Sequence, residues 1–299
     1  MKIKGKKILV TGGSGFIGEN LIKKLKQLNA QTSNYDISNG NSILDYKNLE
    51  HTLKKKFDVI YHLASFSGSK QSNENIEHSL KINTLATTKL LELSVKYSPK
   101  AKVIFSNSRL EYGVTQYLPV DEKHPTNPIS AYGFSKLAST QIALVFHEAS
   151  KLDVTIFRTS NVYGPHSKSK FLGYNLINHY IDLASKGREL IVYGDGSQER
   201  DYIYIDDLLD AFISALESPY SGQIYNLGFG KGIKLVEMAM LIIKFAGKGK
   251  LKFTDWPIDY KRVETGSYVS DIRKIKRELN FSPKIDFEEG INKTISKQF

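Results

Sequence analysis

Lys7-Ile-Leu-Val-Thr-Gly-Gly-Ser-Gly-Phe-Ile-Gly18 is the most informative stretch of this sequence. A short apolar run ends at three spaced glycines, Gly12, Gly15 and Gly18, and an amphipathic segment starts among them. This pattern predicts a buried strand, a tight turn and a helix. Glycines let a phosphate approach the backbone of the turn, and the first N–H groups of the helix attract its charge. The stretch therefore predicts a dinucleotide-binding site at the first strand of a sheet.

Asp36 supports this prediction. It follows the next predicted strand and stands 18 positions beyond Gly18. A carboxylate there can accept hydrogen bonds from both ribose hydroxyls of a dinucleotide and would repel a 2′-phosphate. We therefore expect NAD rather than NADP, with Asp36 and Ile37 in the cofactor site.

The remaining sequence alternates short β-branched runs with longer amphipathic segments. We expect further strands at about residues 32–35, 59–64, 102–106 and 154–159. We expect helices at about residues 15–28, 46–56, 74–97 and 132–150. Strands and helices in this order form βαβ units, so we predict an α/β fold with a Rossmann-type, doubly wound parallel sheet.

After about residue 165 the sequence changes to longer helical patterns, at about residues 175–186 and 236–246, separated by polar segments. We therefore expect residues 1–165 to form the NAD-binding Rossmann domain. Residues 166–299 should form mainly a smaller C-terminal substrate-binding lobe. Strands near residues 190–193 and 224–227, within the segment 189–230, could return to the first sheet.

The composition narrows the class of protein. The chain has 299 residues, 40% of them hydrophobic, and no cysteine, which excludes disulfides, thiolate metal sites and cysteine nucleophiles. We expect no metal, and we expect His62 to be a packed histidine at the end of its strand without a chemical role. A basic stub runs directly into the first strand, and no apolar run approaches the ~20 residues of a membrane span. We expect a cytoplasmic protein without a membrane partner.

The formal charge of +11 would suit an anionic partner. The lysines are scattered, however, and the two denser runs, residues 54–56 and 244–252, are not interleaved with aromatics that could stack on bases. We therefore expect a solvated basic surface and no nucleic-acid partner.

Tyr132 and Lys136 stand four apart in Ala131-Tyr-Gly-Phe-Ser-Lys136, so both side chains leave the same face of a predicted helix. A phenol is a poor base at neutral pH, but a nearby ammonium and an oxidised nicotinamide both favour the phenolate and lower its pKa. Taken alone the pair also fits an ordinary surface helix. The glycine turn upstream favours the chemical interpretation, with Tyr132 as acid and base.

These motifs together resemble the extended short-chain dehydrogenases/reductases, the NAD-dependent epimerase/dehydratase family. The spacing G-x-x-G-x-x-G is typical of that family, and the resemblance covers nearly the whole chain. It implies that NAD contacts the glycines, Asp36, Tyr132 and Lys136. It further implies that Phe16 and Ile17 lie over the pyrophosphate, that Ser42 and Ile43 flank the adenine, and that Leu63, Ala64, Ser65 and Asn83 lie beside the cofactor.

The resemblance also supplies a third catalytic residue. Ser108, in Val103-Ile-Phe-Ser-Asn-Ser-Arg-Leu-Glu-Tyr-Gly113, matches the hydroxyl that binds the reacting oxygen of the substrate. Ser106 is the alternative, although a cap at the strand end is its simpler interpretation. Sugar dehydratases of the family carry an acidic pair directly after the hydroxyl residue, to act on C5 and C6. Arg109 and Leu110 stand there in this chain, which argues against dehydration, and Glu111 is expected to be a local polar residue.

Two later segments match the family's substrate site. Phe157-Arg-Thr-Ser-Asn-Val-Tyr-Gly-Pro165 implies that Asn161 approaches a diphosphate, and Gly194-Asp-Gly-Ser-Gln-Glu-Arg-Asp201 implies that Arg200 clamps it. An ion pair of Arg200 with Asp206 or Asp207 is the alternative. Further substrate-binding candidates at the nucleotide end are Asn175 and Arg262.

The resemblance implies a nucleotide-sugar 4-epimerase, of the UDP-glucose or UDP-N-acetylglucosamine type, that works through a transient 4-keto sugar. A dehydratase or reductase of the same family is the first alternative. A non-catalytic NAD-sensing or RNA-binding protein on this scaffold is the second. The two long predicted helices, residues 74–97 and 132–150, could pair across a homodimer as in the family.

Overall fold

The computed structural model describes residues 3–165 and 175–298. In this part of the chain the main sheet has six parallel strands in the order β2-β1-β3-β4-β5-β9. Their bounds are Lys7–Thr11 (β1), Gln31–Tyr35 (β2), Val59–His62 (β3), Lys102–Ser108 (β4), Asp153–Thr159 (β5) and Gln223–Leu227 (β9). The first five strands lie where the sequence predicted them, and the Rossmann-type α/β fold is confirmed.

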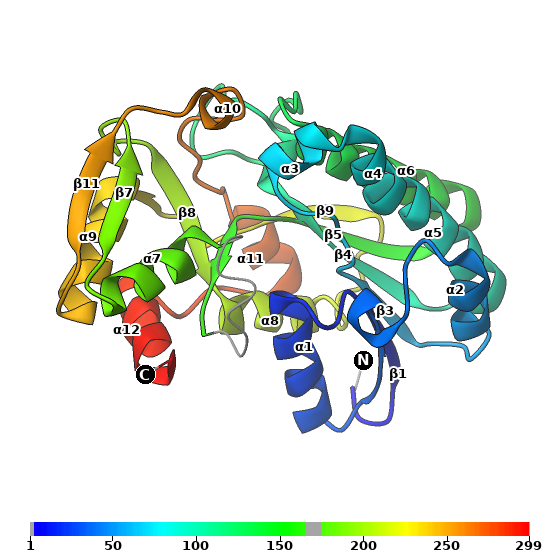
Figure 1. The fold of residues 1–299 in the computed structure, drawn as a ribbon. Coiled ribbons are helices and arrows are strands. Elements are labelled where there is room, and N and C mark those ends of the chain that lie inside the picture. Colours follow the sequence, from blue (N-terminus) through cyan, green and yellow to red (C-terminus); the bar gives the residue numbers. More distant parts are fainter. Residues whose placement is uncertain (1–2, 166–174, 299) are drawn as a thin grey trace.

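Helices cover both faces of this sheet (Figure 1). Ile8 and Val10 of β1 pack in one hydrophobic cluster with α1 and α8, whereas Leu9 packs in a second cluster with α2, α5 and α6. Successive residues of a strand point to opposite faces, so both faces of β1 are buried. These helices are α1 (Phe16–Gln27), α2 (Tyr46–Leu53), α5 (Ala86–Tyr97), α6 (Ala131–Ser150) and α8 (Ile205–Ser214).

The helix predicted over about residues 74–97 is present from Ile76 to Tyr97. It consists of α4 (Ile76–Leu80), a π-helical turn η2 (Lys81–Leu85) and α5, which follow one another without a break, and the short α3 (Ser69–Glu74) precedes it. Such π turns occur mostly within helices and frequently at functional sites. Here the turn contains Asn83, a predicted cofactor-site residue.

The second lobe has its own small sheets. β6 (Asn161–Tyr163), β8 (Glu199–Tyr204) and β10 (Gly232–Lys234) form one, and β7 (Glu189–Tyr193) pairs with β11 (Lys250–Thr254) in the other. Of the two strands expected to return to the main sheet, β9 does so and β7 does not.

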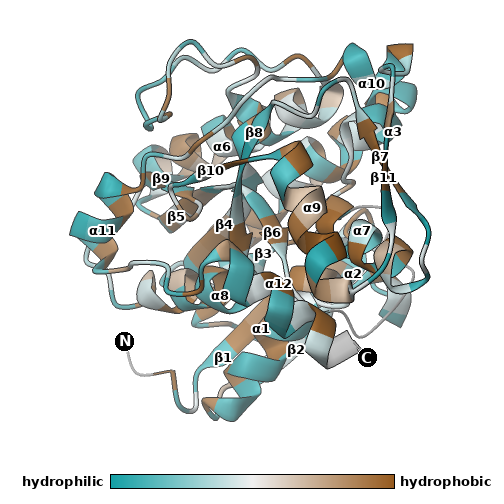
Figure 2. Ribbon diagram, turned by 90° about the vertical axis from the view of Figure 1, so that its left-hand side faces the viewer, coloured by the Kyte–Doolittle hydropathy of each residue, from teal (hydrophilic) through white to brown (hydrophobic). Residues whose placement is uncertain are grey.

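Further helices in the second half of the chain are α7 (Leu176–Ser185), α9 (Leu235–Ala246), α10 (Ile258–Lys261), α11 (Arg273–Leu279) and α12 (Phe287–Gln298). α11 packs against β9 of the main sheet. α9 packs against α7 and α12, and Figure 2 shows α9 as largely hydrophobic and α11 as largely hydrophilic.

The division of the chain at residue 165 remains a proposal. Within residues 3–165 and 175–298, no helix has the length and apolar character needed to cross a bilayer.

Candidate active site

In the glycine turn between β1 and α1, backbone segments pack closely and leave room for a ligand. Gly12 has φ +69°, and a Cβ there would lie 2.6 Å from the amide nitrogen of Ala64. A Cβ at Gly18 would lie 2.4 Å from the carbonyl oxygen of Gly12, whereas one at Gly15 would meet only that oxygen, at 3.3 Å. Gly12 and Gly18 thus let strand, turn and helix pack, and Gly15 leaves the turn open. Gly15 provides no side-chain cap for α1, so the turn suits a pyrophosphate.

Asp36 lies beside this turn. One carboxylate oxygen accepts a hydrogen bond from the Ser14 amide at 3.1 Å and the other from the Ser38 amide at 2.9 Å. These bonds fix the carboxylate at the end of β2, where a ribose would lie. Ile37, the next residue, is exposed and begins the 3-10 turn η1 (Ile37–Asn39).

The segment after β3 runs next to the same turn. The backbone amides of Leu63 and Ala64 donate to the carbonyl (3.0 Å) and hydroxyl (3.3 Å) oxygens of Thr11, which holds residues 63–65 against the glycines. His62 is buried, with its ring nitrogens 2.7 Å from Thr11 Oγ1 and 2.8 Å from Thr87 Oγ1. This agrees with the expected packed histidine.

The remaining predicted cofactor residues have varied surroundings. Phe16 and Ile17 are partly buried in the first turn of α1. Ser42 Oγ accepts a hydrogen bond from the Leu44 amide at 3.2 Å, and Ile43 is buried in the core on the α2 face. Their contacts with the cofactor stay predictions.

Asn83 connects three parts of the site. Its amide oxygen accepts hydrogen bonds from the Phe66 amide (2.8 Å) and the Ser65 hydroxyl (3.1 Å). Its amide nitrogen donates to the Phe66 carbonyl (3.0 Å) and to Ser135 Oγ (2.9 Å). Because the side chain is buried and already bonded, its evident role is to position the segment after β3 against α6.

Tyr132, Lys136 and Ser108 come together where β4 ends and α6 begins. The Lys136 ammonium lies 5.9 Å from the centroid of the Tyr132 ring and donates to the Ser106 carbonyl at 3.3 Å. The hydroxyls of Ser67, Ser65 and Ser108 lie close enough to the phenol of Tyr132 to lower its pKa. The structure thus brings the three predicted catalytic residues together, whereas Ser106 contributes its carbonyl to hold Lys136.

Burial dominates the electrostatics of Tyr132 and Lys136 in the chain alone. Burial raises the pKa of Tyr132 in the chain alone, and the three serine hydroxyls oppose that effect without cancelling it. Burial also lowers the pKa of Lys136 to about 8. The expected lowering of the phenol pKa included the charge of an oxidised nicotinamide, so it stays a prediction for the enzyme with NAD bound.

Glu111 is a residue whose importance the sequence did not reveal. It is 0% exposed and forms a 2.8 Å ion pair with Arg158 Nε, which is itself 3% exposed. Thr140 Oγ1 lies 3.0 and 3.1 Å from its two carboxylate oxygens, and its negative charge raises the pKa of Lys136. Glu111, expected to be a local polar residue, is thus a buried charge that favours the protonated form of Lys136. The only sign of this role in the sequence is that Glu111 stands three positions after Ser108.

The proposed diphosphate clamp is held by the second lobe. Arg200 forms an ion pair with Glu264 and donates to the carbonyl oxygens of Glu199 (3.0 Å) and Gly266 (2.5 Å). The alternative partners Asp206 and Asp207 are not used, and Asp207 instead accepts from the amides of residues 284 and 285.

The other substrate candidates are spread around this lobe. Asn161 donates to the Asp201 carbonyl at 3.2 Å. Asn175 caps α7, with its side chain accepting from the Asn178 amide at 3.3 Å and donating to the Val162 carbonyl at 2.7 Å. Arg262 is exposed after α10. Substrate contacts of all three stay predictions.

The positions after Ser108 begin the 3-10 turn η3 (Arg109–Glu111), where Ser108 Oγ accepts from the Leu110 amide at 3.1 Å. Arg109 is buried and donates to Thr265 Oγ1 at 3.1 Å. No carboxylate therefore follows Ser108 directly.

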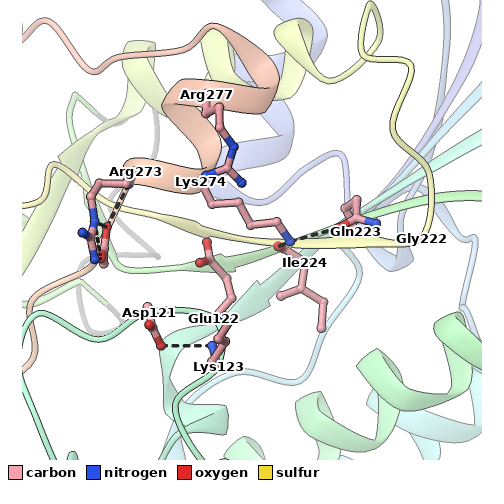
Figure 3. A pocket seen from close by; sticks show the side chains of 10 residues that line it. Asp121, Glu122, Lys123, Gly222, Gln223, Ile224, Arg273, Lys274 and Arg277 are labelled. Atoms are coloured by element: carbon pink, nitrogen blue, oxygen red, sulfur yellow. Dashed lines mark hydrogen bonds and ion pairs between the residues drawn. The ribbon is translucent and has the colours of Figure 1, made fainter.

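A surface pocket of about 550 Å³ lies elsewhere, at the edge strand β9 (Figure 3). Lys274 of α11 donates to the Ile224 carbonyl at 2.8 Å and to Gln223 Oε1 at 3.0 Å. Glu122 accepts from the Asn226 amide at 2.8 Å. These side chains satisfy backbone groups of the strand edge, and no predicted site residue lines the pocket.

Comparison with known proteins adds independent evidence. Residues 8–228 match the model of the NAD dependent epimerase/dehydratase family. A Methanocaldococcus jannaschii protein named "Putative UDP-glucose 4-epimerase" is 32% identical, with 97% of each chain covered. The UDP-N-acetyl-alpha-D-glucosaminuronate decarboxylase of Bacillus cytotoxicus is 29% identical, also with 97% of each chain covered.

A solved structure agrees with these matches. The UDP-glucose 4-epimerase of Thermotoga maritima, crystallised with UDP-glucose, is 28% identical with a TM-score of 0.87 and 97% of each chain covered. The motifs, the strand order and these similarities lead to one conclusion: this chain is an enzyme of the NAD dependent epimerase/dehydratase family, and its cofactor is NAD.

Proposed function

We propose that the protein is a nucleotide-sugar 4-epimerase acting on a hexose of the UDP-glucose or UDP-N-acetylglucosamine type. One observation carries the proposal: Ser108, Tyr132 and Lys136 meet at one point, while Arg109 and Leu110 occupy the positions of a dehydratase's acidic pair. The similarity to UDP-glucose 4-epimerases supports it.

Tyr132, Ser108 and Lys136 each have a separate role in this reaction. Tyr132, as phenolate, takes the proton of the C4 hydroxyl while the Ser108 hydroxyl hydrogen-bonds the same oxygen. The Lys136 ammonium stabilises the phenolate. NAD, which the glycine turn and Asp36 would hold, would supply reversible hydride acceptance at C4 and would not be consumed. Tyr132 finally returns the proton, which leaves the inverted alcohol.

The test is to incubate the purified protein separately with UDP-glucose and UDP-N-acetylglucosamine and to follow the C4 configuration by NMR. We expect the 4-epimer without net NADH, and a loss of about 10²–10⁴-fold in kcat for Tyr132→Phe. Tyr46→Phe, at an exposed tyrosine, is the matched control and should keep full activity.

Other products would reject epimerisation. A persistent keto sugar or stoichiometric NADH would favour a dehydratase or reductase. Absence of turnover together with salt-sensitive RNA binding would favour a non-catalytic protein.

The homodimer and the cytoplasmic location expected from the sequence belong to the same proposal. Large apolar side chains are exposed on the two helical segments expected to pair, which supports a dimer. They are Ile76, Leu85, Phe134 and Val145. Burying such a patch against its symmetry copy removes apolar surface from water.

A further inference from the structure

Arg109 and Arg200 lie close together beside the candidate active site, and both are largely buried. Arg109 directly follows Ser108 and is 9% exposed, and the side chain of Arg200 is 11% exposed. Burial, and then the positive charge of Arg200, lower the pKa of Arg109 to about 10. Because two neighbouring cations repel each other, this place in the molecule favours a negative group.

Three consecutive residues bind both arginines in this structure. Arg200 forms an ion pair with the Glu264 carboxylate and donates to the Gly266 carbonyl at 2.5 Å. Arg109 Nη1 donates to Thr265 Oγ1 at 3.1 Å, and this is its one hydrogen bond to the described residues. The segment thus places one carboxylate and two neutral oxygens on the two guanidiniums.

One carboxylate does not balance two guanidiniums. Among residues 3–165 and 175–298, Glu264 is the acidic residue within ion-pair distance of Arg200, and none lies within that distance of Arg109. The two arginines therefore keep an excess of positive charge. A diphosphate carries about two negative charges, and each of its phosphate groups matches the planar fork of a guanidinium. Its charge suits this place better than the single charge of Glu264.

A local hydrogen-bond pattern lets the segment that carries Glu264 shift as a unit. The segment leaves the end of β11 and includes α10 (Figure 1). The amides of residues 260–264 donate to carbonyl oxygens of residues 257–261, within the segment itself. The chain is tied to β8 further on, where the Tyr268 amide donates to the Glu199 carbonyl at 3.0 Å. Glu264 can therefore leave Arg200 without breaking the hydrogen bonds of a strand.

We propose that Glu264 is an internal competitor of the substrate: its carboxylate occupies Arg200 until the diphosphate of the nucleotide sugar displaces it, and this competition sets the affinity for the nucleotide. The inference rests on the proposed function, in which Arg200 binds the diphosphate. A ligand binds more weakly when its site is open in only a fraction of the molecules, so Glu264 lowers the affinity and favours release of the product. The alternative is that Glu264 stays in place and orients Arg200 for the ligand.

Calorimetry with UDP as the probe tests the competition. Glu264→Gln keeps the shape of the side chain but removes its charge, so UDP should bind this variant about tenfold more tightly than the wild type. In the Arg200→Gln protein the same change should alter the Kd of UDP by less than about twofold, because the guanidinium for which the two anions compete is absent. Glu189→Gln, which removes an exposed ion pair with Lys252, is the matched control and should leave the Kd unchanged.

Hydrogen exchange of the wild-type protein gives a second measurement. The Gly266 amide donates to Glu264 Oε1 at 2.9 Å. If the diphosphate displaces Glu264, the peptide that contains this amide should exchange faster with UDP bound. Slower exchange would show that Glu264 stays in place, and the inference would be wrong.

Unchanged or weaker binding of UDP by Glu264→Gln would also overturn the inference and assign Glu264 to orienting Arg200. If this variant does not fold, Glu264→Ala replaces it with the same expected result. Epimerase activity together with unchanged UDP affinity would reject the inference alone. Tighter UDP binding without an epimerised product would keep the inference and reject the proposed reaction. If UDP binds neither the wild type nor the variant, the inference fails.

Discussion

Replacing Glu111 by glutamine should lower both the free energy of unfolding and the pKa of Lys136. The substitution keeps the side-chain shape but leaves Arg158, 3% exposed, as an unpaired buried cation. Breaking such a pair costs about 3–5 kcal/mol of unfolding free energy. At roughly 2 °C per kcal/mol for a chain of this size, the Tm should fall by about 6–10 °C.

The same substitution should change the pH profile. The negative charge of Glu111 raises the pKa of Lys136, which burial lowers to about 8. Without that charge the Lys136 ammonium loses its proton at lower pH. The alkaline limb of kcat/KM should therefore move to lower pH, because activity needs the ammonium beside Tyr132.

Thermal unfolding followed by circular dichroism and a pH–rate profile measure the two effects. Glu148→Gln, at an exposed glutamate of α6, is the control and should change neither quantity. The double variant Glu111→Leu, Arg158→Met should recover part of the lost stability, because it removes both buried charges. The reasoning is refuted if Glu111→Gln melts with the control and its alkaline limb stays in place.

Three further predictions concern the first half of the chain. Burial lowers the pKa of His62 to about 3 in the folded protein, whereas the unfolded chain titrates near 6.5. Below pH 6.5 the unfolded state therefore gains a proton that the folded state does not bind. The free energy of unfolding should fall by about 1.4 kcal/mol for each pH unit below that point. His62→Gln should therefore show a shallower loss of stability between pH 6.5 and 4.5 in urea titrations, and parallel curves would contradict this. Gly15→Ala should fold with wild-type Tm but bind NAD about tenfold more weakly, as measured by calorimetry. Gly18→Ala should lower the Tm, because a Cβ at Gly18 collides with the Gly12 backbone and a Cβ at Gly15 does not. Asp36→Asn should reduce the preference for NAD over NADP by about tenfold or more in Kd, because a charge that repels the 2′-phosphate is removed; an unchanged ratio would show that the carboxylate does not face the ribose.

Local patterns in the sequence were sufficient for the first five strands, the glycine turn and the placement of Tyr132 and Lys136 on one helix face. Each depends on spacing within a single element. The π turn η2 was not visible, because it accompanies contacts of Asn83 with Phe66 and Ser135, which are distant in sequence. β7 was equally ambiguous, since its apolar run fits either sheet.

The role of Glu111 escaped for a similar reason. Its partner Arg158 lies 47 positions away on the neighbouring strand β5, and a single acidic residue gives no sign of such a partner. Strand pairing between β4 and β5 brings the two together. The effect of burial on the pKa of Tyr132 was not visible in the sequence either, because it depends on the packing of the whole cleft.

The side chains that close the edge of β9 have a consequence for how this protein behaves at high concentration. An open strand edge can template the addition of a strand from a neighbouring molecule. Here an incoming backbone would have to displace the Glu122 carboxylate from the Asn226 amide and the Lys274 ammonium from the Ile224 carbonyl. These two charged side chains should therefore hinder edge-to-edge pairing of sheets between molecules on the side that carries β9.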